Sequence, residues 1–240
     1  MFYLFPYLMV LSLPSILLAL AAIIPAVILI VRIYRADSRE KEPIRLIVKL
    51  VFLGMAATFF AILTESLGSY VIDEYSLLGK ILMYFIVVAL SEEGFKYLLL
   101  KKATWNNPEF NYQFDGVVYA VAVSLGFALL ENIEYVLSYG FATALVRAVT
   151  AVPGHACFGV FMGTWYGLAR KYANAGDEVR KKRSLMGALI IPVLLHGLYD
   201  FIATMTGEWS WLVFLVFVAG MFYYSWRLVG RGAAEDTFIG

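Results

Sequence analysis

The chain alternates between long apolar runs and short polar connections. A bilayer core requires roughly 20 apolar residues per helix, and seven runs of this chain approach or exceed that length. The connections are too short to enclose a core of their own, so residues 1–240 are predicted to form one integral membrane domain. The last run is the shortest, and we expect its helix to extend past Trp226. The predicted helix cores are 4–31, 46–72, 77–100, 117–139, 142–168, 185–205 and 211–226.

Composition supports this pattern. Hydrophobic residues make up 62% of the chain and charged residues 15%, with a mean hydropathy of +0.78. A soluble domain of this size is much less apolar. The formal net charge of +1 gives no reason to expect nucleic acid as a partner. The single cysteine, Cys157, has no partner for an internal disulfide bond. The predicted fold class is therefore all-α, a polytopic membrane helical bundle of about seven transmembrane helices in a lipid bilayer.

Basic residues indicate the orientation of the bundle. They gather at the first, third and fifth connections and at the C-terminus, which all lie on one side of a seven-span model. The opposite side receives one basic residue, Lys80. By the positive-inside rule, the N-terminus is predicted to lie outside and the C-terminus in the cytoplasm. The clustered residues are Arg32, Arg35, Arg39, Lys41, Arg45, Lys49, Lys101, Lys102, Arg170, Lys171, Arg180, Lys181, Lys182, Arg183, Arg227 and Arg231.

Four consecutive predicted spans contain ionisable or strongly polar residues. Such groups cost about 2.5 to 3.5 kcal/mol each at membrane depth, so they generally face a bundle interior and mark function. Both histidines of the protein belong to this set. The set comprises Glu92, Glu93, Lys96, Glu131, Asn132, Glu134, Arg147, His155, His196 and Asp200.

The third span carries two adjacent carboxylates. Glu92 and Lys96 are four residues apart and share a helical face, whereas Glu93 is turned by about 100°. We therefore expect Lys96 to neutralise one carboxylate without touching both. Two neighbouring carboxylates in a low dielectric do not easily both ionise, so one is suited to act as a general acid or base. The alternative is a buried ion pair that holds the bundle together, which leaves Glu93 unexplained.

The fourth and fifth spans are predicted to form a tight hairpin near Gly140. Residues equally far from this turn lie at similar depth, which pairs Glu134 with Arg147 as a structural contact. Glu131 and Asn132 remain as site candidates, although Glu131 falls toward the outer side of its helix.

The fifth and sixth spans carry the histidines. His155 begins a four-residue repeat with Gly159, Gly163 and Gly167, a stripe on which another helix can approach closely. A role in packing is the alternative for this histidine. Cys157 points away from it, so the two do not form a catalytic dyad. His196 and Asp200 share a helical face, where the carboxylate can orient the imidazole.

Four motifs together resemble one protein family. They are E-E-x-x-K from Glu92 to Lys96, F-x-x-x-E-N from Phe127 to Asn132, the histidine of PGHACFG, and HGLYD from His196 to Asp200. The combination resembles the PrsW family of intramembrane proteases, which is related to the CAAX prenyl endopeptidases and bacterial Abi proteins. The resemblance covers roughly residues 80–205. It implies cleavage of a membrane-bound protein in the cell membrane of a prokaryote. The activity for which the family is named is the first, regulated cut of a membrane-bound anti-sigma factor.

Hydrolysis in hydrocarbon needs a base, a proton donor and a donor for the oxyanion. We assign Glu92 as the base and Glu93 as the group that tunes it, and Glu131 stays a candidate. His155 or His196 would bind water or protonate the leaving amine. Asn132 would donate to the oxyanion, and Asp200 would orient His196.

The residues alone do not decide whether the reaction needs a metal ion. Two histidines, a carboxylate and an open water position also suit Zn²⁺. Because no His-Glu-x-x-His helix is present, we favour a metal-free carboxylate mechanism. The alternative places Zn²⁺ among Glu92, Glu131, His155 and His196. A second class of function is an ion- or proton-coupled transporter, but many transporter folds contain an internal repeat and this sequence shows none. A third is a scaffold whose polar residues only join helices.

Overall fold

The computed structural model describes residues 13–73 and 75–240. These residues form a bundle of helices without a strand, apart from one isolated bridge between Tyr112 and Phe238. The start of the first predicted span lies outside the described residues. The helices are α1 (Leu13–Ala36), α2 (Ile44–Val71), α3 (Leu77–Ile81), a π-helix (Leu82–Ala89), α4 (Leu90–Thr104), α5 (Asp115–Tyr139), α6 (Phe141–Val149), α7 (Ala151–Asn174), α8 (Glu178–Ala203) and α9 (Ser210–Ala234).

The predicted all-α bundle is confirmed. Among the described residues, six helical segments are long and apolar enough to cross a membrane. The last helix extends past Trp226, as expected. The remaining predicted span is divided, because Leu82–Ala89 is π-helical and separates α3 from α4. Within it, the Leu90 N–H reaches back five residues to the Phe85 carbonyl. Such bulges are frequent at functional sites, and this one ends at Ala89, three residues before Glu92.

The predicted hairpin at Gly140 is present. Gly140 ends α5 with a φ of 86°, a left-handed conformation that glycine adopts without strain. The following span is interrupted between α6 and α7. Pro153 lacks the N–H that would bond to the Val149 carbonyl, so α6 ends at Val149 and α7 begins at Ala151.

Helix α5 is the centre of the bundle. In its most apolar window 78% of the residues are buried, compared with 17% for α1 and α9, whose outer faces are free to contact lipid. The glycine stripe of α7 packs against α5, as predicted. A Cβ at Gly163 would lie 2.4 Å from the Gly116 carbonyl oxygen, and one at Gly167 would lie 2.0 Å from the Gln113 oxygen. Only glycine allows the two backbones to come this close.

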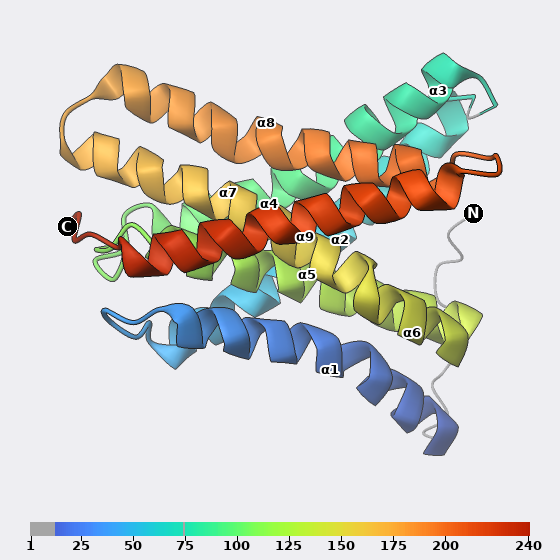
Figure 1. Ribbon diagram of the computed structural model, residues 1–240, viewed down its shortest axis with the longest axis horizontal. Helices are drawn as coiled ribbons and strands as arrows, with labels where there is room; N and C mark the ends of the chain where they lie inside the picture. The colour runs from blue at the N-terminus through green and yellow to red at the C-terminus, as the bar shows by residue number, and fades with distance from the viewer. Residues whose placement is uncertain (1–12, 74) are drawn as a thin grey trace.

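The long helices run side by side along the long axis of the molecule (Figure 1). The connections after α1, α4 and α7 lie at the end that also holds the C-terminus, and α3 lies at the other end (Figure 1). The clustered basic residues of these connections therefore share one end, as the sequence predicted. Which side of the membrane that end faces stays a prediction.

Candidate active site

A cavity of about 350 Å³ lies inside the bundle, between α2, the π-helix, α4, α5 and α8. Glu92, Glu131, His196 and Asp200 all line it, so residues from three of the predicted spans share one hollow. Three more residues of the predicted set are buried next to the cavity without lining it, each at most 4% exposed: Glu93, Lys96 and His155. The expected convergence of acidic and imidazole groups is therefore present in the structure.

Lys96 is the centre of the charged cluster. Its Nζ lies 3.1 Å from Glu92 Oε2 and 2.8 Å from Glu93 Oε1, with no exposure to solvent. The expectation that the lysine would touch only one carboxylate is wrong. Residues three and four apart both lie on the helical face next to the lysine, and its long chain reaches between them. The ammonium also lies 3.8 Å from the centre of the Phe127 ring, a cation–π contact.

His196 lies between two carboxylates. Its Nδ1 is 2.9 Å from Glu93 Oε1, and its Nε2 is 3.4 Å from Asp200 Oδ2. The ring stacks on Phe158, with centroids 4.6 Å apart. Because carboxylates only accept, an imidazole with a proton on each nitrogen satisfies both neighbours. The contact between Asp200 and His196 that their spacing predicted is present, and it is made at Nε2.

His155 connects Lys96 to Glu131. Its Nδ1 is 3.2 Å from Lys96 Nζ, and its Nε2 is 2.8 Å from Glu131 Oε2. An ammonium has donors only, so Nδ1 accepts and the proton is assigned to Nε2, which donates to Glu131. The two histidine rings are 5.3 Å apart and nearly perpendicular. His155 is therefore part of the polar cluster, in addition to lying on the packing stripe.

The predicted pairing of Arg147 with Glu134 is wrong. Arg147 lies 2.9 Å from Glu131, and its Nε donates to Asn132 Oδ1 at 2.8 Å. Counting from Gly140 gave equal depth to Arg147 and Glu134, but a long guanidinium chain reaches the next turn, where two acceptors are available. Glu131, expected toward the outer side of its helix, is thereby held on the cavity wall.

Asn132 is used for packing. Its Nδ2 donates to the Ala22 carbonyl at 2.8 Å, its Oδ1 accepts from Arg147, and the residue is fully buried. It is also absent from the cavity wall. The expectation that its amide would face a substrate oxyanion is therefore wrong, because the amide joins α5 to α1 and α6.

Glu65 is a site residue that the motifs did not reveal. It belongs to α2, is 7% exposed, and lines the same cavity as Glu92. Among the described residues it makes no ion pair. Its position in the sequence could have marked it as a candidate, since it is the only charged residue between Lys49 and Asp73.

Four of these side chains are close enough to one another to hold a metal ion, and the Lys96 ammonium already contacts three of them. Glu92, Glu93, His155 and His196 each offer a ligand atom, and these atoms all lie within 4.8 Å of one another. Glu93 Oε2 is buried and has no hydrogen-bond partner among the described residues. Two imidazoles with carboxylates are a normal donor set for catalytic Zn²⁺. The set differs from the expected one, because Glu93 takes the place of Glu131.

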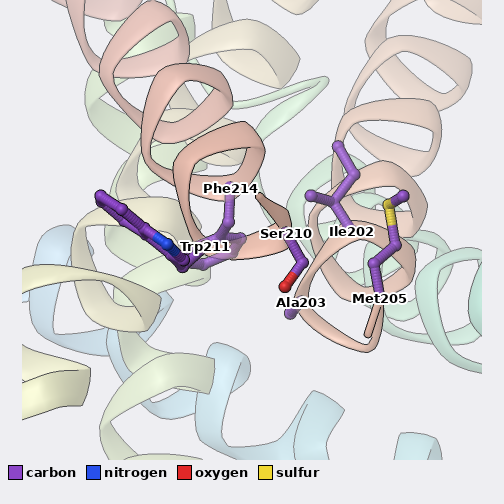
Figure 2. A pocket seen from close by; sticks show the side chains of 6 residues that line it. All are labelled: Ile202, Ala203, Met205, Ser210, Trp211 and Phe214. Atoms are coloured by element: carbon purple, nitrogen blue, oxygen red, sulfur yellow. The ribbon is translucent and has the colours of Figure 1, made fainter. Parts of the chain in front are cut away.

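A second pocket lies at the turn between α8 and α9 (Figure 2). It measures about 260 Å³ and contains no ionisable side chain, so it offers neither an acid nor a base. Its lining residues are Ile202, Ala203, Met205, Ser210, Trp211 and Phe214.

Comparison with known proteins identifies the class. Residues 42–226 match the model of the PrsW family intramembrane metalloprotease. Together with the helical bundle and its internal cavity, this match defines a membrane-embedded protease. The chain belongs to the PrsW family.

Curated relatives support this membership. Protease PrsW of Bacillus subtilis (strain 168) is 35% identical over 201 residues, which cover 82% of this chain and 88% of that protein. The Oceanobacillus iheyensis protein of the same name is 38% identical over 183 residues, covering 76% and 80%. The Clostridioides difficile one is 35% identical over 207 residues, covering 84% and 85%. No solved structure matches this chain.

Proposed function

We propose that the protein hydrolyses a peptide bond of a membrane-bound protein inside the cavity, with Glu92 as general base and His196 as general acid. The observation that carries this proposal is their shared position. Both line one cavity, and both contact Glu93 or its partner Lys96. The cavity is large enough for a peptide carbonyl and a water molecule.

The reaction needs one proton transfer in each direction. Glu92 takes a proton from water while the water oxygen attacks the carbonyl carbon. His196 then gives a proton to the amide nitrogen, and the C–N bond breaks. Glu93 holds His196 by its Nδ1, and Lys96 holds both carboxylates. These buried contacts keep base and acid at a fixed separation.

The oxyanion requires a donor other than Asn132. Thr58 and Thr204 line the cavity, but their hydroxyls already donate to backbone carbonyls, Thr58 to those of Gly54 and Phe127 and Thr204 to that of Phe201. Tyr135 also lines it, and the Arg147 guanidinium lies 4.1 Å from the centre of its ring. We assign the oxyanion to Tyr135.

A metal would be held by Glu92, Glu93, His155 and His196. When bound, Zn²⁺ would lower the pKa of a coordinated water and polarise the carbonyl. In either case Lys96, Asp200 and Arg147 orient the surrounding side chains. Metal analysis of the purified protein, followed by cleavage assays with chelator and with Zn²⁺ restored, distinguishes the two mechanisms.

The depth of the cavity in the membrane indicates which part of a substrate would be cut. The cavity is lined by the C-terminal halves of α2, α5 and α8, and the basic connections lie at the opposite ends of these helices. With the C-terminus in the cytoplasm of a prokaryote, it lies in the outer half of the bilayer. We therefore expect the cut in the outer half of a substrate span. The resemblance to the family favours a membrane-anchored anti-sigma factor as that substrate.

The test is cleavage of a single-span substrate in liposomes by Glu92→Gln and His196→Ala variants. Both are expected to lose at least about a hundredfold in kcat with the fold retained. The matched control is Glu134→Gln, which removes a carboxylate from the same cavity wall outside the proposed chemistry. Full activity of Glu92→Gln refutes the proposal, and loss of proton flux in that variant with cleavage intact favours a transporter.

A further inference from the structure

A second group of buried carboxylates lies at the other end of the molecule. Asp37 follows α1, Glu42 precedes α2, and Asp115 begins α5. The three are at most 3% exposed, and one oxygen from each lies within 4.8 Å of the others. They belong to the end that holds the basic connections and the C-terminus (Figure 1).

Asp37 lacks the partners that a buried carboxylate requires. It is 1% exposed, and neither of its oxygens has a hydrogen-bond partner with good geometry among the described residues, although the backbone N–H groups of Arg39 and Glu40 lie near it. The Lys41 charge acts on Asp37, but its Nζ donates to the backbone carbonyls of Tyr34, Arg35 and Asp37 and makes no ion pair with the carboxylate. A buried, unpartnered carboxylate is costly unless a cation or a proton compensates it.

The two neighbours of Asp37 are held in place and keep acceptor capacity. Asp115 Oδ2 accepts from the backbone N–H groups of Asn111 and Tyr112 at 3.0 and 2.7 Å, whereas its Oδ1 has no partner among the described residues. Glu42 Oε2 accepts from the Tyr119 hydroxyl at 2.5 Å. Burial raises the pKa of the Asp37 carboxyl and raises that of Glu42 to about 7.

We propose that Asp37, Glu42 and Asp115 form a binding site for a hard divalent cation of the size of Ca²⁺. Oxygen ligands are what such cations prefer, and three carboxylates exceed their charge by one. Opposite oxygens around Ca²⁺ are about 4.6 to 5.2 Å apart and those around Mg²⁺ about 4.0 to 4.2 Å. The three oxygens all lie within 4.8 Å of one another, which fits inside a Ca²⁺ coordination shell, and that flexible shell tolerates more varied spacings than the near-octahedral shell of Mg²⁺.

The bound cation joins segments that are distant in sequence. It fixes the connection between α1 and α2 to the first turn of α5. The C-terminal tail adjoins the same turn, because Asp236 accepts from the Phe114 N–H at 2.9 Å and the Ile239 N–H donates to the Asn111 carbonyl at 2.7 Å. Cation binding therefore stabilises this end of the bundle independently of the catalytic cavity.

The experiment measures thermal unfolding of the full chain in detergent, after chelation, against added Ca²⁺ or Mg²⁺ at constant ionic strength. Ca²⁺ is expected to raise Tm by about 5 to 10 °C at a hundredfold excess over Kd, with saturation. Equilibrium dialysis should give one Ca²⁺ per chain at this site. Mg²⁺ should bind more weakly, because it demands near-ideal octahedral geometry and gives up its water reluctantly.

The decisive variant is Asp37→Asn, with Glu235→Gln as matched control. Glu235 is exposed and lies next to Asp236, so its variant should respond like the wild type. Asp37→Asn should lose the Ca²⁺ response and, without Ca²⁺, unfold at or above the wild-type temperature. His196→Ala should keep the response, which separates this site from the cavity.

Three results overturn the proposal. They are no saturable Ca²⁺ effect on the wild type, an equal effect on Asp37→Asn, and loss of the effect in His196→Ala. Should Asp37→Asn fail to fold, Glu42→Gln is measured in its place, and a retained Ca²⁺ response there equally overturns the site.

Discussion

The contact on which the candidate site depends most is the one between Lys96 and its two carboxylates, and Lys96→Met tests it. Methionine keeps most of the apolar volume beside Phe127 but removes the ammonium. The lysine is fully buried, with ion-pair distances of 3.1 and 2.8 Å. Removing one partner of a buried pair costs about 3 to 5 kcal/mol, since an uncompensated charge remains. We expect a loss of unfolding free energy in this range.

The assay is a denaturant titration in mixed micelles that reports the free energy of unfolding. Lys182→Met is the control, because Lys182 is exposed and its removal should change stability by no more than about 0.5 kcal/mol. The double variant Lys96→Met with Glu93→Gln also removes one of the two carboxylates that the single variant leaves without a cation. It should be more stable than the sum of the single effects by about 0.5 to 3 kcal/mol. A loss below about 1 kcal/mol for Lys96→Met, or strict additivity, would refute the role of Lys96 as the central cation.

Three further substitutions test other parts of the molecule. Asp200→Asn should lower kcat about tenfold or more with little change in KM, because the far nitrogen of His196 loses its anionic partner; unchanged kcat contradicts this. Tyr135→Phe should lower kcat by about 10²- to 10³-fold in the same cleavage assay if its hydroxyl binds the oxyanion, and wild-type turnover rules that role out. Gly163→Ala should cost about 1 to 3 kcal/mol of unfolding free energy, since its Cβ meets backbone atoms of α5 at 2.4 Å. Its control is Gly94→Ala, whose Cβ meets nothing within 4 Å and should be neutral or stabilising.

Much of the fold was predictable because the bilayer imposes one length on every span. Apolar runs located the spans, Gly140 located a hairpin, and the basic residues located the connections of one end. The π-helix at Leu82–Ala89 was not predictable. It contains no proline or glycine, and its register depends on how the neighbouring helices pack against it.

The candidate site was predictable as a set of residues but less so as a network. Spacing along one helix identified Glu92, Lys96 and the pair of His196 with Asp200. Contacts between helices depend on the reach of long side chains, which sequence distance does not give. For this reason Arg147 was assigned to the wrong glutamate. Glu65 was overlooked because it stands alone, without a motif.

The charge balance of the cavity explains why both a glutamate and a metal mechanism remain compatible with its residues. The carboxyl groups in and behind the wall are Glu65, Glu92, Glu93, Glu131, Glu134 and Asp200. The permanent cations among them are Lys96 and Arg147, joined by two histidines. Even with both histidines protonated, acidic groups exceed cations by two. A low-dielectric interior does not hold such an excess, so the cavity retains protons or a divalent cation. Because metal ligands must be deprotonated, Zn²⁺ and these protons compete, and proton release on Zn²⁺ addition measures which of them the cluster holds.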